Sequence, residues 1–365
     1  MTAADCSHMA RALMLARRGL ATTDPNPRVG CVIVQNATRV GEGWHERAGA
    51  AHAEVNALAQ AGAQAAGATV YVTLEPCAHT GRTPPCADAL IAARVARVVV
   101  ATVDPNPLVG GAGIDRLRAA GIVVEVGVLE QQARQLNPGF FMRMTRGRPY
   151  VRIKLATSLD GRTAMRTGES QWITGEAARA DVQRFRASAS VILTGIGTVM
   201  RDDPRLTVRP ETGRTPLRVV VDSRFRTPPG ARLLREPGPV LIAGLADTVA
   251  GGREQLRAAG AELALFDGDE GRVPLAELLH ELASRGANEV WTEAGSTLAG
   301  SLMEERLVDE LVLYMAPRLL GNDAQGLFEL PGLTRLDQSP RLHIVDMRAV
   351  GDDWRIVACP VQPGH

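Results

Sequence analysis

Residues 52–86 hold the feature that most constrains this chain. His52 and Glu54 stand in the tripeptide H-A-E, and two cysteines follow, Cys77 and Cys86, each directly after a proline. A catalytic zinc ion takes three protein ligands and keeps a fourth position for water. His52, Cys77 and Cys86 supply such a set. The pattern therefore predicts a zinc centre, and it requires a fold that brings together segments distant in sequence.

Glu54 is the predicted proton shuttle of this centre. It lies two residues beyond His52, near the start of an expected helix, so that both side chains can approach one cavity. We expect Glu54 to accept a proton from the water that zinc acidifies and to return protons to a ring nitrogen and to leaving ammonia. Zinc with a neighbouring shuttle glutamate is typical of enzymes that deaminate nucleobase-like rings. Pro85 suits the start of a helix, whose N-terminus lowers the pKa of the Cys86 thiol.

Several histidines and cysteines leave alternatives open. Taken singly, the two loop cysteines are also compatible with buried apolar thiols, and His52 with a structural histidine. His79, inside the cysteine loop, is a rival third ligand. His45 either faces the substrate or has a structural or surface role. The remaining cysteines are expected to take no part in metal binding, one lying in an apolar run and two near the termini: Cys31, Cys6 and Cys359.

Length and composition narrow the class of protein. A chain of 365 residues favours two domains. A net charge of +1, without interleaved basic and aromatic residues, argues against a nucleic-acid binder. No apolar run reaches the roughly 18–20 residues that span a bilayer, and the N-terminus is typical of an amphipathic helix rather than a signal peptide. An odd number of cysteines without an export signal favours a cytoplasmic location and no disulfide framework.

Strand and helix patterns alternate in both halves, which predicts an α/β fold. In the first half we expect helices at 5–18, 52–61 and 87–93 and strands at 29–34, 69–74 and 98–102. In the second we expect strands at 150–155, 191–194, 218–222, 240–243, 289–293 and 311–316 and helices at 177–187 and 298–305. The basic segment 143–149 lacks apolar periodicity, so we place the domains at 1–146 and 147–365. D-P-N-P occurs at 24–27 and 104–107, which we interpret as shared turn chemistry, not duplication.

Two segments of the second half have the character of ligand sites. V-I-L-T-G-I-G-T-V-M offers two glycines of a dinucleotide fingerprint, but Met200 stands at the third position and no long helix follows, so we reject that fold. V-W-T-E-A-G-S-T-L predicts a strand, a turn and a helix start, where Ser296 and Thr297 either bind a cofactor phosphate or cap the helix. Lys154, the only lysine, points either into a pocket or to a salt bridge on the sheet.

Several motifs carry a family resemblance. P-N-P-R-V-G-C-V-I-V, H-A-E and T-L-E-P-C-A-H-T-G-R-T-P-P-C resemble the cytidine deaminase-like superfamily. Its general signature spaces the cysteines as C-x2-C, whereas the spacing here is C-x8-C, which is similar to the riboflavin-biosynthesis branch. K-L-A-T-S-L-D-G-R, S-Q-W-I-T, D-D-P-R-L-T-V-R and E-A-G-S-T-L resemble the reductase of the same pathway. Along nearly its whole length the chain thus resembles the bifunctional deaminase–reductases of riboflavin biosynthesis.

This resemblance implies a cytidine deaminase-like three-layer domain followed by a dihydrofolate reductase-like domain. It implies zinc-dependent deamination of 2,5-diamino-6-(ribosylamino)pyrimidin-4-one 5′-phosphate, then NADPH-dependent reduction of the ribosyl group to ribityl. It also implies a homo-oligomer, a dimer through the reductase domain, with no nucleic-acid or membrane partner. The rival interpretations are a deaminase whose second domain is not catalytic, and a nucleic-acid-editing deaminase, against which the near-neutral charge argues.

The resemblance also implies the residues of the reductase site, carried over by motif. The substrate would be held by Ser170, Arg186, Leu206, Arg209 and Glu293. Arg186 and Arg209 suit the ribose phosphate because a guanidinium fork matches phosphate oxygens. The NADPH site would be lined by Ala156, Trp172, Thr198, Asp202, Ser223, Gly295, Ser296, Thr297, Leu298, Ala299, Gly300 and Ser301.

Overall fold

The computed structural model describes residues 2–79, 84–209, 214–248, 250–268 and 271–361. Its contacts divide the chain into two compact units, Met1–Arg148 and Pro149–His365. The boundary expected from the sequence, between 146 and 147, falls at the end of helix α6 (Pro138–Arg146). The sequence patterns do not predict this helix. Within the described ranges, no helix combines the length and apolarity needed to cross a membrane.

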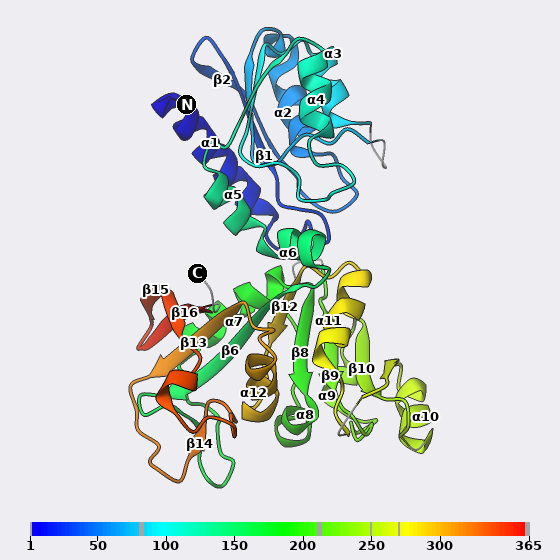
Figure 1. The fold of residues 1–365 in the computed structure, drawn as a ribbon, viewed down its shortest axis with the longest axis vertical. Coiled ribbons are helices and arrows are strands. Elements are labelled where there is room, and N and C mark those ends of the chain that lie inside the picture. Colours follow the sequence, from blue (N-terminus) through cyan, green and yellow to red (C-terminus); the bar gives the residue numbers. More distant parts are fainter. Residues whose placement is uncertain (1, 80–83, 210–213, 249, 269–270, 362–365) are drawn as a thin grey trace. The chain divides into compact units, whose positions relative to one another are not determined.

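In the first unit, helices cover both faces of a mixed sheet (Figure 1). Within the described residues the strand order is β2-β1-β3-β4-β5: β1 (Gly30–Gln35), β2 (Thr38–Trp44), β3 (Thr69–Val72), β4 (Arg97–Val100) and β5 (Val123–Val126). Strand β1 pairs antiparallel with β2 and β3, and β3, β4 and β5 are parallel.

Alternation along β1 builds the layers of this unit, because successive side chains of a strand point to opposite faces. Cys31 and Ile33 pack in one apolar cluster with α2 (Ala53–Ala61), α3 (Cys86–Ala92) and α4 (Ala112–Ala119). Val32 and Val34 pack in another with α1 (Ala3–Ala16) and α5 (Glu130–Leu136). The unit is therefore a three-layer α/β/α domain, and Cys31 lies in its core as expected.

The second unit contains a longer sheet. Among the described residues its order is β11-β10-β9-β8-β12-β6-β13-β16-β15: β6 (Tyr150–Ser158), β8 (Val191–Gly195), β9 (Leu217–Val221), β10 (Val240–Leu245), β11 (Glu262–Phe266), β12 (Glu289–Thr292), β13 (Glu310–Ala316), β15 (Leu342–Val350) and β16 (Asp353–Pro360). The strands from β11 to β13 are parallel, and β16 and β15 are antiparallel. A small separate sheet joins β7 (Arg162–Ala164) to β14 (Gln325–Gly326).

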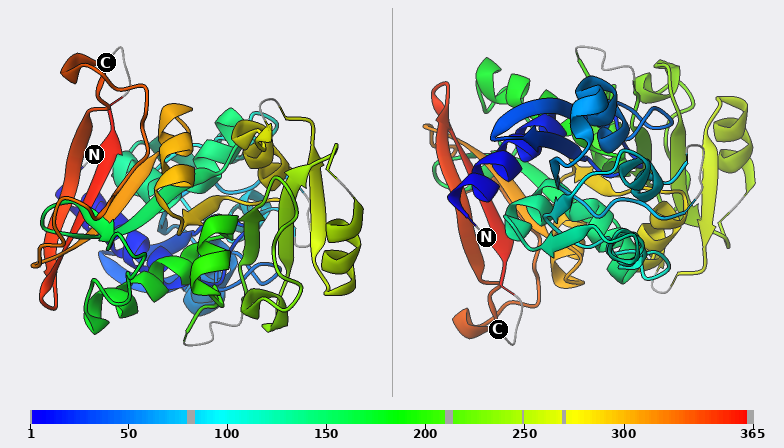
Figure 2. Two further views of the ribbon diagram at one scale, coloured as in Figure 1. Left: turned by 90° about the horizontal axis from the view of Figure 1, so that it is seen from below. Right: turned by 90° about the horizontal axis from the view of Figure 1, so that it is seen from above.

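Helices cover both faces of this sheet as well. One apolar cluster joins the sheet to α11 (Leu275–Ser284) and α12 (Ser296–Glu304). The opposite clusters join it to α7 (Glu176–Ser188), α8 (Ile196–Asp202), α9 (Arg232–Arg235) and α10 (Ala250–Ala258). Both views of Figure 2 show β15 and β16, in red, at one edge of the sheet and α10, in yellow-green, beyond the other.

The predicted strands and helices are present with shifted ends, but several elements went unpredicted. Strand β2 was not predicted because glycines interrupt its apolar pattern. A Cβ on Gly41 or Gly43 would lie 2.3 Å from a carbonyl oxygen of α2. These glycines let the helix backbone lie directly on the strand. Helix α8 is present but short, which agrees with rejecting a dinucleotide fingerprint at this turn.

Candidate functional site

The predicted zinc ligands converge at the ends of two helices and one strand. His52 is the N-cap residue of α2, Cys86 is the first residue of α3, and Cys77 lies in the loop after β3. His52 Nδ1 is 3.2 Å from Cys86 Sγ and 3.6 Å from Cys77 Sγ. Tetrahedral zinc with ordinary Zn–S and Zn–N bonds separates such atoms by about 3.6 Å. The three residues therefore fit zinc.

His79 does not join this group. The described residues contain one cluster of metal-ligating side chains, in which the ligand atoms of His52, Cys77 and Cys86 lie within 4.8 Å of one another. His79 is exposed in the cysteine loop. The part of that loop at residues 80–83 lies outside the described residues.

The two cysteine thiols differ in pKa. The hydrogen bond from the Cys86 thiol, followed by that from His52, lowers the pKa of Cys77 to about 4. The same thiol–thiol bond and burial raise the pKa of Cys86, so the lowered pKa expected from the helix N-terminus is not observed. The backbone N–H of Cys86 also donates to Cys77 Sγ at 3.4 Å. A bound zinc ion deprotonates such a thiol outright, so both cysteines suit the metal.

Glu54 lies in the first turn of α2 and is 3% exposed. Burial raises the pKa of its carboxyl to about 7, against the attraction of His52. A carboxyl that titrates near neutral pH can both take and give a proton. The position and environment of Glu54 thus suit the shuttle role that the sequence predicts.

His45 supports the metal site from inside the protein. It is buried, and its Nδ1 bonds the Ala51 carbonyl oxygen at 3.1 Å, next to His52. Its Nε2 lies 3.1 Å from Nδ2 of Asn26, a residue of the first D-P-N-P segment. Burial lowers the pKa of His45, which favours the neutral ring that this pattern requires. The burial and the hydrogen bonds of His45 support the structural role among those left open by the sequence.

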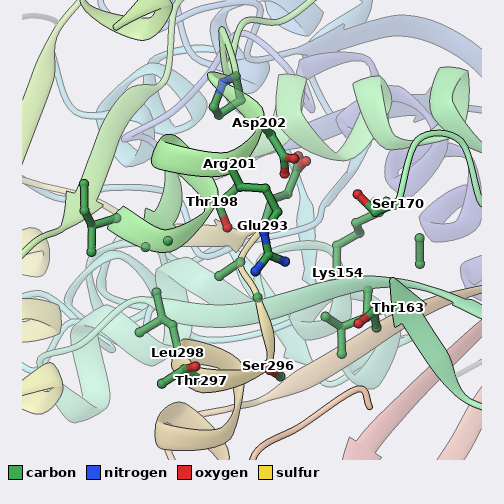
Figure 3. A pocket seen from close by; sticks show the side chains of 18 of the residues that line it. Lys154, Thr163, Ser170, Thr198, Arg201, Asp202, Glu293, Ser296, Thr297 and Leu298 are labelled. Atoms are coloured by element: carbon green, nitrogen blue, oxygen red, sulfur yellow. The ribbon is translucent and has the colours of Figure 1, made fainter. Parts of the chain in front are cut away.

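The second unit has a cavity of about 1370 Å³ at the carboxyl ends of β6, β8, β9 and β12. Open α/β sheets bind ligands at this edge. Pockets for one drug-sized ligand measure roughly 300–1,000 Å³, so this cavity has room for a dinucleotide beside a second molecule. In Figure 3, Thr198 and Asp202 from α8 face Ser296, Thr297 and Leu298 at the start of α12.

Most residues carried over by motif meet in this cavity. The substrate set lines it completely, as does the NADPH set apart from two residues of α12. Ala299 packs in the core instead, and a Cβ on Gly300 would lie 2.1 Å from the Glu329 carbonyl oxygen. Both residues sit on the side of α12 that faces the protein interior. Neither residue is among those that line the cavity.

Arg186 and Arg209 have different partners, although both are expected from the sequence to bind the ribose phosphate. The Arg186 fork donates to the Glu293 carboxylate, through Nε at 2.5 Å and Nη2 at 2.8 Å. Its Nη1 donates to the Thr207 carbonyl oxygen at 2.9 Å. The fork expected to hold a phosphate therefore holds a carboxylate. Arg209 is exposed at the cavity, and within the described chain its guanidinium makes no ion pair.

Lys154 faces the cavity. It lines the cavity together with Glu293 and Arg186, and no salt bridge of its ammonium group is found in the described residues. Burial lowers the pKa of Lys154, and the charge of Glu293 opposes this shift. Although burial opposes it, Arg186 and then Lys154 hold the pKa of Glu293 at about 2. Of the two alternatives for Lys154, the pocket is observed.

The cavity suits phosphorylated ligands. Of the described residues that line the cavity, nine are basic and five are acidic. Gly295, the N-cap residue of α12, has no side chain to cap the helix, and among the described residues no side chain is found to accept from its first N–H groups. Ser296 and Thr297 donate their hydroxyls to Glu329 instead, at 3.0 and 2.9 Å. Free helix N–H groups hold phosphate oxygens, so these residues fit a dinucleotide phosphate.

Sequence reasoning missed several of these basic residues because arginines outside the core carry no periodic signal. They are Arg179, Arg201, Arg205, Arg226, Arg232 and Arg272. Arg179 lies over the exposed Trp172 ring, 4.7 Å from its centroid, and so helps fix one wall. The local hints in the sequence are that Arg205 lies inside the D-D-P-R-L-T-V-R motif and that Arg201 directly precedes it.

In comparisons with known proteins, a different family matches each of the two units of the chain. The family "Cytidine and deoxycytidylate deaminase zinc-binding region" matches residues 2–102, and "RibD C-terminal domain" matches residues 149–356. The RibD protein of Escherichia coli (strain K12) is 50% identical over 359 residues, 95% of this chain and 96% of its own. The chain belongs to the RibD family.

Solved structures agree. RibD from Acinetobacter baumannii (form 1) matches with a TM-score of 0.91 at 46% identity, over 98% of this chain and 99% of its own. The diaminohydroxyphosphoribosylaminopyrimidine deaminase/5-amino-6-(5-phosphoribosylamino)uracil reductase from Thermotoga maritima matches with a TM-score of 0.86 at 32% identity, over 98% and 99%. The predicted fold class, a deaminase domain followed by a dihydrofolate reductase-like domain, is confirmed.

As a RibD protein, the chain is a bifunctional deaminase and reductase of riboflavin biosynthesis. His52, Cys77 and Cys86 form the zinc site of its deaminase domain, and its reductase domain uses NADPH. The enzyme acts on a phosphorylated pyrimidine. Neither rival interpretation, a non-catalytic second domain or a nucleic-acid-editing enzyme, agrees with this membership.

Proposed function

We propose that the deaminase domain removes the exocyclic amine of 2,5-diamino-6-(ribosylamino)pyrimidin-4-one 5′-phosphate. The reductase domain then reduces the opened ribosyl group to ribityl with NADPH. The observation that carries the first step is the position of the buried Glu54, two residues from the zinc ligand His52. The distances from His52 Nδ1 to the sulfur atoms of Cys77 and Cys86 are close to those of tetrahedral zinc. A large, basic cavity in the other unit supports the second step.

In the deamination, Glu54 handles the protons. When bound by His52, Cys77 and Cys86, zinc supplies an acidified water molecule at its open position. Glu54 takes the proton of that water and delivers protons to the ring nitrogen and to the leaving ammonia. Burial keeps Glu54 away from bulk water, which favours the neutral state that the carboxyl reaches after accepting a proton. The His45 bond to Ala51 keeps the His52 segment in place.

In the reduction, the cofactor performs the chemistry and the protein orients the reactants. We assign the NADPH site to Ala156, Trp172, Thr198, Asp202, Ser223, Gly295, Ser296, Thr297, Leu298 and Ser301, which line the cavity. Backbone N–H groups at the start of α12 hold a phosphate of the cofactor. Ala299 and Gly300 support that turn from the interior.

The substrate lies against Ser170, Leu206, Arg209 and the Arg186–Glu293 pair, which line the same cavity. Arg209 holds the ribose phosphate, because its guanidinium is exposed and that of Arg186 is engaged by Glu293. Lys154, whose pKa burial lowers, faces the cavity beside Glu293 and supplies the proton that sugar reduction requires.

Replacing Glu54 with glutamine tests the two-site proposal. Glu54→Gln keeps the shape of the side chain but cannot carry the proton, so ammonia release should fall about 100-fold or more. Zinc content should remain, since no metal ligand changes. Oxidation of NADPH with the supplied deaminated intermediate should be unchanged.

The chelator treatment of the unaltered enzyme is the matched control for that variant. Removal of zinc should likewise stop ammonia release, spare NADPH oxidation, and be reversed by added zinc. Equal loss of both activities in Glu54→Gln would contradict two separate sites.

We also propose that the enzyme is a homodimer through its reductase domain. Strand β15 is an edge strand, and its apolar side chains are 41–55% exposed: Leu342, Ile344, Val345 and Met347. An exposed apolar edge strand favours pairing with another strand, and a second copy offers the same edge. Sedimentation should show a dimer, and Ile344→Lys should give the monomer; a monomeric unaltered enzyme would contradict this.

A cytoplasmic location is the last part of the proposal. All five cysteines are free thiols, which is typical of proteins kept in a reducing compartment. Fractionation of cells that produce the tagged chain would test it, and recovery outside the cytoplasm would contradict it.

A further inference from the structure

Glu75, in the T-L-E-P-C motif, has no role in the chemistry described above, yet it is 5% exposed. Its carboxylate accepts four backbone N–H groups: those of Asp104 at 3.1 Å, Gly111 at 2.9 Å, Gly113 at 2.9 Å and Ile114 at 3.2 Å. The second D-P-N-P segment and the first turn of α4 thus close around one side chain. A carboxylate at a helix N-terminus is favoured by the helix dipole.

Helix α4 also touches the residue that precedes a zinc ligand. A Cβ on Gly113 would lie 1.9 Å from the carbonyl oxygen of Pro76, so the helix backbone packs directly on Pro76. Pro76 is bonded to Cys77 in the chain. The position of α4 therefore limits where Cys77 can lie.

Arg116, on the same helix, reaches both cysteine segments. Its Nη1 donates to the Ala78 carbonyl oxygen at 3.1 Å, one residue after Cys77. Its Nε lies 2.6 Å from the Asp88 carboxylate on α3, two residues after Cys86. Helix α4 thus contacts the chain on both sides of Cys77 and close behind Cys86.

We propose that α4 positions Cys77 and Cys86 for zinc, through Glu75, the Gly113–Pro76 contact and Arg116. These are positioning residues, since none of them offers a ligand atom to the metal cluster among the described residues. Groups that orient metal ligands change metal affinity or activity by about 10- to 100-fold when removed. The proposal rests on the zinc site, and its test reads zinc affinity directly, without the substrate.

The first test is Glu75→Gln in the full chain. Glutamine has one acceptor oxygen, and its amide N–H groups oppose the backbone donors that the carboxylate satisfied. Competition with a zinc chelator should show a zinc dissociation constant raised about 10- to 100-fold. Ammonia release should recover in excess zinc, and the amide hydrogens of Gly113 and Ile114 should exchange faster with solvent. NADPH oxidation should stay unchanged.

The second test avoids a buried position. Arg116→Gln alters a side chain that is 46% exposed. Arg118→Gln is the matched control, because Arg118 lies on the same helix, is 54% exposed and forms an ion pair with Asp115. Arg116→Gln should weaken zinc binding and Arg118→Gln should leave it unchanged. Unchanged zinc affinity in Glu75→Gln, or equal affinity in the two arginine variants, would overturn the proposal. Loss of NADPH oxidation alongside zinc would overturn it too, because α4 belongs to the deaminase unit.

Discussion

Replacing Arg209 by methionine is expected to weaken binding of the ribose phosphate in the reductase domain. The Arg209 guanidinium is exposed at the cavity, whereas the Arg186 fork is bonded to Glu293. A hydrogen bond to a charged group contributes about 1.5–3 kcal/mol, which corresponds to a change in KM of roughly 10- to 150-fold. Because solvent screens an exposed charge, we expect the lower end, about tenfold.

The assay follows NADPH oxidation at saturating NADPH while the deaminated intermediate is varied. The same intermediate without its phosphate serves as the control substrate, and Arg184→Met serves as the control variant. Arg184 lies on α7 and is 85% exposed. In Arg209→Met the KM should rise for the phosphorylated substrate only, and kcat should change little. The difference should shrink as salt screens the charges.

Two results would refute this reasoning. An equal rise in KM for both substrates would mean that Arg209 does not contact the phosphate. A loss of stability beyond about 0.5 kcal/mol would mean that the side chain supports the fold, which an exposed residue should not do. Urea unfolding of the variant gives the second quantity.

Two further predictions concern stability. Arg186→Met leaves the part-buried Glu293 without its main partner, so urea unfolding should show the reductase unit destabilised by about 3 kcal/mol, the lower end for a buried pair; an unchanged midpoint would contradict this. Arg97, with hydrogen bonds from Tyr71 and Thr2, holds the pKa of Asp5 well below its ordinary value, so Asp5 stabilises the deaminase unit above about pH 4 and loses this effect as the pH falls further. Asp5→Asn should cost about 3 kcal/mol at pH 7, and its difference from the unaltered enzyme should shrink below pH 4.

The zinc site was predictable because its chemistry is local. Ligand types and their order indicate a metal without knowledge of the fold, and the neighbouring glutamate leads to the prediction of a proton shuttle. Helix starts at His52 and Cys86 follow from the same segments. The sequence favoured His52 as the third ligand but left His79 as a rival, because His79 lies between the two cysteines; the folded structure places only His52 with them among the described residues.

Pairings across long stretches of chain were not predictable. Arg186 and Glu293 are 107 residues apart, and either alone is compatible with a phosphate or substrate contact. Their mutual bond exists because β12 and α7 pack together, which no local pattern shows. The contacts of Glu75 with α4 are hidden for the same reason, since α4 itself went unpredicted.

The charged residues of the reductase cavity differ in burial, and we expect this difference to determine which of them bind ligands. Arg186 is part-buried and bonded to Glu293, because an unpaired buried charge is strongly unfavourable. Arg209, Arg226 and Arg232 are exposed, so water solvates them until a phosphate arrives. A phosphate that displaces this water gains charge-assisted hydrogen bonds without breaking an internal ion pair. We therefore predict that the exposed arginines bind ligand phosphates, whereas the part-buried Arg186 holds the shape of the cavity.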